Sequence, residues 1–207
     1  MCGRYFLSKS FKELVTRYKI FQPQTVPNIS FGSEIYPSQL APVVVKNKKK
    51  ELVFMNWGFS PSFSDKLLIN ARGETVEKKP TFKNSFYYKR CLVPAEAYFE
   101  WERKNVIETG NDIKKIKRKI KPVEREIFSM AGIYQEFIAT DDTPYFAFSI
   151  LTVASTGKLK KIHHRMPVIL NEKEENIWLD SGINDFKVLK QVIKPYQSEL
   201  LIVDNID

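Results

Sequence analysis

Short segments rich in β-branched and aromatic residues recur along most of this chain, and helical patterns do not separate them regularly. These segments are 43–46, 51–55, 92–101, 127–137, 145–154, 167–170 and 200–203. A doubly wound parallel sheet needs a helix between successive strands, so this order argues against that fold. We therefore predict an α+β chain in which a mainly antiparallel, barrel-like sheet carries peripheral helices.

Local signals place some of these elements more closely. Ser10 and Glu13 have the spacing of a capping box, and apolar residues follow at helical spacing, which predicts a helix over 10–19. The polar turn 47–50 lies between two strand-like runs and predicts a hairpin. Further helical patterns occupy 73–79, 172–180 and 185–193.

The size and charge of the chain limit what it can be. A length of 207 residues suits one buried core, and no linker or internal repeat interrupts it, so we expect a single domain over 1–207. No stretch approaches the ~18 apolar residues of a membrane span, and the first residues lack the apolar core of a secretion signal. We expect a cytoplasmic monomer without a membrane partner. A net charge of +9 favours polyanions, although it does not separate DNA from RNA or anionic lipid.

The basic charge is concentrated in segment 113–121, which reads IKKIKRKIK and holds six basic residues and no acidic one. A solvated hairpin arm following Gly110, Asn111 and Asp112 is the simpler interpretation. An arm that grasps nucleic acid is the functional one.

Cys2 has the most distinctive chemistry in the chain. Its small side chain permits removal of Met1, which would leave an amine and a thiol on adjacent carbons. Such an aminothiol condenses with an aldehyde to an imine, and the thiol then closes a five-membered thiazolidine, an intramolecular step with an effective molarity of ~10⁵ M or more. The other cysteine, Cys91, lies in an apolar run and is expected to be buried. Two cysteines make neither a disulfide framework nor a zinc set, so we expect no metal and no cofactor.

Other candidate residues lie in short motifs downstream. Gly3 allows close backbone approach beside Cys2, and Arg4 places a cation there. Asn70 can orient an amine or a carbonyl without titrating, and Arg72 can contact a phosphate through two hydrogen bonds. Asn70 and Arg72 also have a structural interpretation, because the segment 69–75 can be a surface turn that starts a helix.

Two further motifs supply groups that titrate. Glu100 lies between aromatic residues, where a carboxyl tends to have a raised pKa, unless it faces solvent at the end of its strand. His163 and His164 are the only histidines, and no acidic or cysteine set at ligand spacing accompanies them, so an acid–base role beside Arg165 is preferred to metal binding.

Taken in order, these motifs resemble the SOS-response-associated peptidase family. The resemblance runs from residue 2 to about residue 170 and is carried by MCGR, the WGF stretch, INARGET, PAEAYFEW and HHRMP. It implies a barrel-like α+β domain with a groove for single-stranded DNA, self-removal of Met1, and a thiazolidine crosslink to the opened sugar of an abasic site. It also implies a thiol autopeptidase with lyase activity, located on the nucleoid when DNA is damaged.

The resemblance assigns a role to each motif residue. Cys2 would be the nucleophile, Asn70 would orient its amine or the sugar, and Glu100 and His163 would transfer protons. Trp57 would be an aromatic wedge that stacks near the lesion. Phosphates would be held by Arg4, Arg72 and Arg165.

The chain departs from the family pattern at three places. Glu34, Ile35, Tyr36 and Pro37 stand where the family has an Asn-x-Ala-Pro turn, Ala97 replaces a glycine, and the insertion 103–121 is more basic than usual.

Two other functions remain open from the sequence. Glutamine-amidotransferase-like hydrolases also begin Met-Cys-Gly. They continue with a small apolar residue and have a larger glutamine-binding apparatus, whereas Arg4 of this chain suits a phosphate. A non-catalytic module that binds single-stranded nucleic acid would need only the net charge. A glutaminase assay distinguishes the amidotransferase-like hydrolase from the abasic-site protein. A Cys2→Ala variant that binds and behaves as the wild type does would indicate the non-catalytic module.

Overall fold

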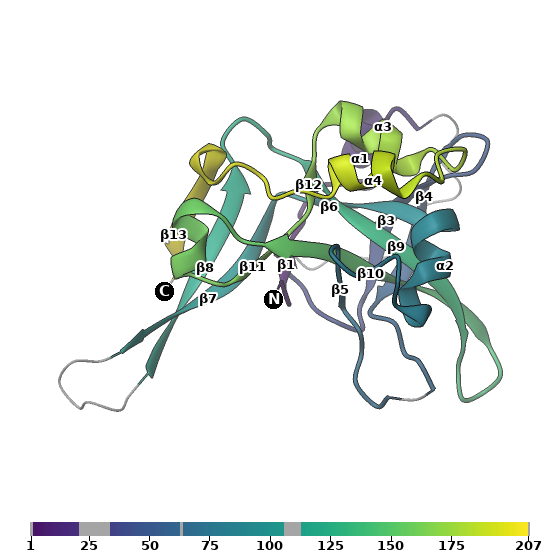
Figure 1. Ribbon diagram of the computed structural model, residues 1–207, viewed down its shortest axis with the longest axis horizontal. Helices are drawn as coiled ribbons and strands as arrows, with labels where there is room; N and C mark the ends of the chain where they lie inside the picture. The colour runs from purple at the N-terminus through teal and green to yellow at the C-terminus, as the bar shows by residue number, and fades with distance from the viewer. Residues whose placement is uncertain (1, 21–33, 63, 106–112, 207) are drawn as a thin grey trace.

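Two curved sheets form the framework of the protein, in a computed structural model that describes residues 2–20, 34–62, 64–105 and 113–206 (Figure 1). One sheet has the strand order β13-β8-β7-β1-β2. Its strands are β1 (Tyr5–Phe6), β2 (Glu34–Ile35), β7 (Ala97–Asn105), β8 (Ile113–Pro122) and β13 (Leu201–Ile206). All of its pairings are antiparallel.

The larger sheet closes into a barrel. Its strands are β3 (Leu40–Lys46), β4 (Lys50–Trp57), β5 (Asn70–Arg72), β6 (Arg90–Ala95), β9 (Phe128–Ile138), β10 (Pro144–Ala154), β11 (Arg165–Pro167) and β12 (Ile169–Leu170). The order β10-β4-β3-β6-β9 returns to β10 because β9 and β10 also pair, which makes a ring of strands. Among the strands that the structure describes, β10 pairs in parallel with β4 and β5, and the other pairings of this sheet are antiparallel. The predicted mainly antiparallel, barrel-like α+β fold is confirmed.

In the described parts of the chain four α-helices lie against these sheets: α1 (Phe11–Tyr18), α2 (Pro80–Tyr88), α3 (Glu172–Leu179) and α4 (Phe186–Val192). Two short 3-10 helices, η1 (Gly157–Lys161) and η2 (Ser198–Leu200), are also present. The capping box of α1 is present, since the Ser10 hydroxyl accepts from the Glu13 amide and the Glu13 carboxylate accepts from the Ser10 amide. The predictions for α1, α3, α4 and the β3–β4 hairpin are confirmed.

The predicted helix over 73–79 is wrong, because this segment forms turns and the helix begins only at Pro80. Hydrogen bonds from Thr75 to Arg72 and from Lys78 to Thr75 close successive tight turns. Proline suits the first position of a helix, since its φ is already helical and it lacks an amide that would go unpaired there.

The run 92–101, expected as one strand, is two strands in different sheets. β6 ends at Ala95 in the barrel and β7 starts at Ala97 in the other sheet. Glu96 stands between them, and its amide donates to the Phe6 carbonyl at 2.8 Å. A single sequence segment therefore connects the two sheets and carries Glu100 away from the barrel.

Among the described residues, no helix has both the length and the apolar character needed to cross a membrane.

Candidate active site

Cys2 lies just before β1 and is fully buried, with 0% of its surface exposed. Its Sγ is 3.7 Å from the Arg4 carbonyl oxygen, to which the thiol donates. Burial raises the pKa of the Cys2 thiol well above its ordinary value, and the nearby negative charge of Glu100 raises it further. The thiol is therefore neutral near pH 7, and it needs a base or an activated partner to react.

Asn70 brings the barrel to Cys2. It begins β5, where it is paired with Ile150 of β10, and its Nδ2 donates to the Cys2 carbonyl at 3.0 Å. Its Oδ1 is buried, and no described group donates a hydrogen bond to it. A buried carbonyl oxygen without a donor is costly, so this atom offers an acceptor for an N–H or O–H brought to Cys2.

Glu100 and His163 face one another beside Cys2. Glu100 on β7 is 3% exposed, and burial raises the pKa of its carboxyl to about 7. Glu100 Oε1 and His163 Nδ1 are 3.7 Å apart. The Arg165 amide donates to His163 Nδ1 at 3.0 Å, and burial lowers the pKa of His163. Near pH 7 the imidazole is neutral and the carboxyl is close to half protonated, which suits a group that both gives and takes protons.

The four residues predicted to be catalytic thus form one cluster at the junction of the two sheets. Cys2 precedes β1 by three residues, and Glu100 lies on β7, so both come from the side of the smaller sheet. Asn70 and His163 come from the barrel side. Asn70 begins β5, and His163 lies two residues before β11. The Asn70–Cys2 hydrogen bond and the His163–Glu100 contact both cross this junction.

Arg4 and Arg72 differ in their contacts, because Arg4 has an acidic partner and Arg72 is exposed. The Arg4 guanidinium lies 4.2 Å from the ring centre of Tyr36 and 5.1 Å from that of Trp101, and it pairs with Glu34 at 3.1 Å. Arg72 ends β5 two residues after Asn70 and is exposed. Arg72 therefore remains available for a phosphate, whereas a phosphate at Arg4 would meet the carboxylate of Glu34.

The acidic departure at Glu34 is compensated by the basic insertion. Lys117 of β8 pairs with Glu34 Oε1 at 2.6 Å, while Arg4 and the Tyr36 hydroxyl contact Oε2. Although burial opposes it, the hydrogen bond and charge of Lys117, with help from Arg4, leave the Glu34 pKa below its ordinary value. The two departures from the family pattern therefore belong to one ion-pair network. The change at Ala97 is mild, since its φ is not positive.

Trp57 does not fit the expected role of a wedge that stacks on DNA. The side chain is 0% exposed, and its ring stacks on Phe148 and meets Tyr5 edge-on. Its Nε1 donates to the Ile69 carbonyl at 3.0 Å. No ring face is left for a base, and Trp57 instead fixes the residue that precedes Asn70. The following Gly58 has a φ of +119°, which side chains rarely tolerate.

Arg165 is also a poor phosphate ligand in this arrangement. It is 9% exposed and forms two hydrogen bonds with Glu74, at 2.7 and 2.8 Å, while it also donates to the Thr152 carbonyl. The bond from Arg165 lowers the pKa of Glu74. Glu74 was missed as a functional neighbour because a carboxylate after an exposed turn resembles an ordinary helix start. The pair fixes β11, the strand that begins two residues after His163.

Gly73 allows this part of the site to pack closely. A Cβ at Gly73 would lie 2.4 Å from Cγ2 of Ile193, at the end of α4. We expect Gly73→Ala to lower the free energy of unfolding by about 1–3 kcal/mol, as overpacking does, measured by urea denaturation. Adding Ile193→Ala removes the clashing methyl group, so the double variant should show a favourable coupling energy. Simple additivity of the two losses would contradict this explanation.

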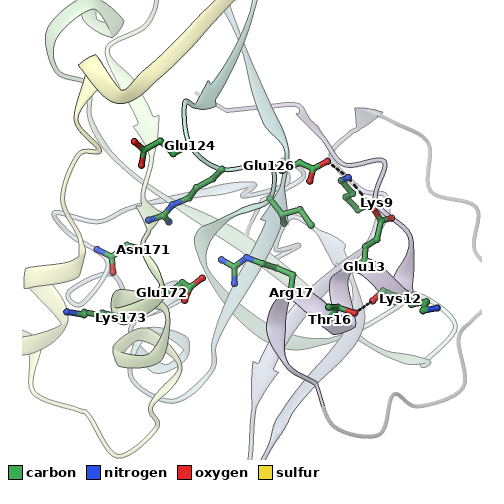
Figure 2. A pocket seen from close by; sticks show the side chains of 12 residues that line it. Lys9, Lys12, Glu13, Thr16, Arg17, Glu124, Glu126, Asn171, Glu172 and Lys173 are labelled. Carbon is green, nitrogen blue, oxygen red and sulfur yellow. Dashed lines mark hydrogen bonds and ion pairs between the residues drawn. The ribbon is translucent and has the colours of Figure 1, made fainter.

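The large surface hollow in Figure 2 is separate from this cluster. It measures about 1010 Å³ and lies between α1, the segment 124–127 and the start of α3. Lysine, arginine and glutamate side chains line it together, and Lys9 pairs there with Glu13 and Glu126. None of the four clustered residues borders it. Within the described residues no group of histidine, cysteine and acidic side chains is arranged to hold a metal ion.

Relatives of this chain share both its sequence and its fold. The abasic site processing protein YoqW of Bacillus subtilis (strain 168) is 30% identical over 207 aligned residues, covering 96% of this chain and 89% of that protein. The abasic site processing protein HMCES of Xenopus tropicalis is 28% identical, over 73% of this chain and 52% of its own length. A crystal structure of a Bacteroides thetaiotaomicron protein has 26% identity and a TM-score of 0.86, covering 100% of this chain and 92% of the other.

A match to the family described as SOS response associated peptidase (SRAP) extends over residues 1–207. The similarity therefore reaches beyond the five motifs and includes the C-terminal helices. The chain belongs to the SOS response associated peptidase family.

Proposed function

We propose that this protein binds single-stranded DNA at an abasic site and traps the opened sugar on Cys2 after removing its own Met1. The observation that carries the proposal is the buried cluster in which Asn70 holds Cys2 and a carboxyl with a pKa of about 7 lies beside it. The names of the relatives, abasic site processing proteins, support the same substrate.

The first step frees the amine. The Cys2 thiol attacks the Met1 carbonyl carbon and gives its proton to the departing amine of Cys2. Water then hydrolyses the thioester, which releases Met1 and restores the thiol. Glu100 is the nearby base, since a pKa of about 7 leaves part of it ionised at neutral pH.

The second step captures the sugar. The free amine attacks C1′ of the ring-opened deoxyribose, and water leaves to give an imine. The thiol then adds to the imine carbon, its proton passing to nitrogen, so that the thiazolidine forms with net loss of one water. The imine is also the species from which β-elimination cleaves the strand, so lyase activity belongs to the same proposal.

Each clustered residue has a place in this reaction. The Asn70 Oδ1 accepts a hydrogen bond from the amine or from a sugar hydroxyl. Glu100 protonates the leaving hydroxyl as the imine forms. His163, whose pKa is lowered by burial, accepts the proton and returns it when the ring reopens.

Intact-mass measurement tests the proposal. Protein whose trimming has been verified is incubated with an oligonucleotide containing one abasic site, and with the same oligonucleotide lacking it. The expected product has the combined mass of protein and DNA less one water, survives denaturation and forms only with the lesion. Unmodified DNA after incubation with trimmed protein would overturn the proposal. Release of ammonia from glutamine by the same sample would instead favour an amidohydrolase.

A further inference from the structure

The smaller sheet carries most of its positive charge on one face. Side chains alternate along a strand, so the odd-numbered lysines of β8 point to the same side: Lys115, Lys117, Lys119 and Lys121. On β7, Arg103, Trp101 and Phe99 pair with the first three of these lysines and share that side. The other face carries Lys104, Lys114 and Arg118. We call the first of these the lysine face.

The charges of this face are largely uncompensated. Lys117 pairs with Glu34, but within the described parts of the chain no carboxylate makes an ion pair with Lys115, Lys119 or Lys121. Lysines at alternate strand positions are about 7 Å apart, so the four span about 20 Å. This length matches about six nucleotides of a stacked strand, whose phosphates are about 3.4 Å apart. The row can therefore follow a phosphodiester backbone.

Aromatic side chains are interleaved with these cations. Tyr36 is 39% exposed, and Arg4 lies against it and against Trp101. The Lys119 ammonium lies 4.0 Å from the ring centre of Phe6. Alternating cations and aromatic rings are typical of surfaces that bind single strands, where bases stack on rings and lysines contact phosphates.

The face is also hollowed, and Arg4 connects it to the chain at Cys2, although Glu100 points to the opposite side of β7. A hollow of about 530 Å³ lies beside Phe6 and Ile202, and both the basic residues Lys119, Lys121 and Arg125 and the acidic residues Glu96, Glu124 and Glu126 border it. Arg4, at the near end, follows Cys2 by two residues. In Figure 1, β7 and β8 lie beside β1 and extend toward the lower left. Arg4 lies against Trp101, which is opposite Lys117, so a strand passing Arg4 would reach the row at Lys117 and could continue along it.

We infer that the lysine face binds the single-stranded DNA that flanks the lesion, as a second binding surface beyond the residues around Cys2. The position of the lesion beside Cys2 rests on the proposed function. Binding of an undamaged strand to the lysine face does not need the chemistry of Cys2. Lysines that served only to keep the hairpin soluble would bind no DNA.

The experiment compares two double variants on opposite faces of the same hairpin. Lys115→Gln/Lys121→Gln removes two charges from the lysine face. Lys104→Gln/Lys114→Gln, a cross-strand pair, removes two from the other face. Affinity for undamaged, fluorescently labelled single-stranded DNA is measured at several salt concentrations. Two lost phosphate contacts should weaken binding at low salt by about tenfold and reduce the log–log salt slope by about 1.4.

The control variant should bind nearly as the wild type does, and thermal denaturation should show that both variants fold. Equal losses in the two variants would mean that net charge alone attracts DNA, which overturns the inference. Unchanged binding in the lysine-face variant would overturn it as well.

Crosslinking to two abasic oligonucleotides then separates this inference from the proposed function. One has a long flank on the 5′ side of the lesion and the other on the 3′ side. The lysine-face variant should crosslink more slowly than wild type with only one of them. Crosslinking absent even in wild type would count against the proposed function and leave the binding result standing.

Discussion

Replacing Cys2 with alanine should abolish the heat-stable DNA adduct, reducing it by about a hundredfold or more. Because alanine lacks the thiol that would release Met1, the variant is trimmed with an added methionine aminopeptidase, and intact mass verifies its free amine in the same position. It can form the imine but cannot close the ring, and an imine hydrolyses on denaturation. The measurement is the fraction of abasic oligonucleotide that migrates with protein in a denaturing gel. The size of the loss reflects the advantage of an intramolecular ring closure.

Two comparisons identify the thiol as the group responsible. Borohydride reduction should trap the alanine variant as a secondary amine, and Cys2→Ser should lie between alanine and wild type because its hydroxyl is a poorer nucleophile. Cys91→Ala is the matched control, since Cys91 is equally buried but lies in the barrel. A stable adduct of Cys2→Ala without reductant would show that another residue makes the bond.

Glu100→Gln should slow adduct formation by about 10²–10⁴-fold, because glutamine keeps the shape of the side chain and cannot transfer a proton. Rates are measured in single-turnover experiments with trimmed protein across the pH range. In the wild type the protonated carboxyl is lost as pH rises through about 7, which gives a falling limb there. That limb should be absent in the variant. Glu102→Gln, two residues along the same face and paired with Arg118, should keep it.

The same substitution should stabilise the fold at alkaline pH. The pKa of Glu100 rises from 4.5 in the unfolded chain to about 7 in the folded one. Below pH 4.5 the carboxyl is neutral in both states and costs nothing. As pH rises toward 7 only the unfolded chain ionises, so wild-type stability falls, and above 7 the full cost of about 3 kcal/mol remains. Urea denaturation should therefore show Glu100→Gln more stable than wild type at pH 8, with the gap closing by pH 4.5. A gap independent of pH would contradict the raised pKa.

Local sequence signals predicted much of the fold. The capping box at Ser10 and Glu13 and the polar turn of the β3–β4 hairpin act over a few residues, so their outcome can be read from the sequence. The break at Glu96 depends instead on Phe6, which is distant in the chain and accepts the Glu96 amide. Nothing in the apolar run around it marks that change of sheet. Pro80 did carry a local signal for the start of α2, and it was overlooked.

The candidate site was predictable in part for a similar reason. Cys2, Asn70, Glu100 and His163 were selected for chemistry that their residue types allow, and the fold brings them together. Whether a side chain is exposed cannot be predicted from its residue type alone. Trp57 looks equally suited to a core or a binding surface, and only the packing of Phe148 and Tyr5 around it decides the matter. Whether Arg165 is free likewise depends on Glu74, ninety-one positions away.

The location of the cluster at the meeting of two sheets has a mechanical consequence. The nucleophile and the acid lie on one side and the amide and the imidazole on the other, so a small slippage between the halves would separate Asn70 from Cys2 and His163 from Glu100. The Tyr5–Trp57 contact, at a centroid distance of 5.2 Å, joins the halves beneath the reacting groups. Reactivity is therefore tied to the alignment of the whole molecule, and a loosened chain would lose its ability to attack aldehydes before it lost its fold.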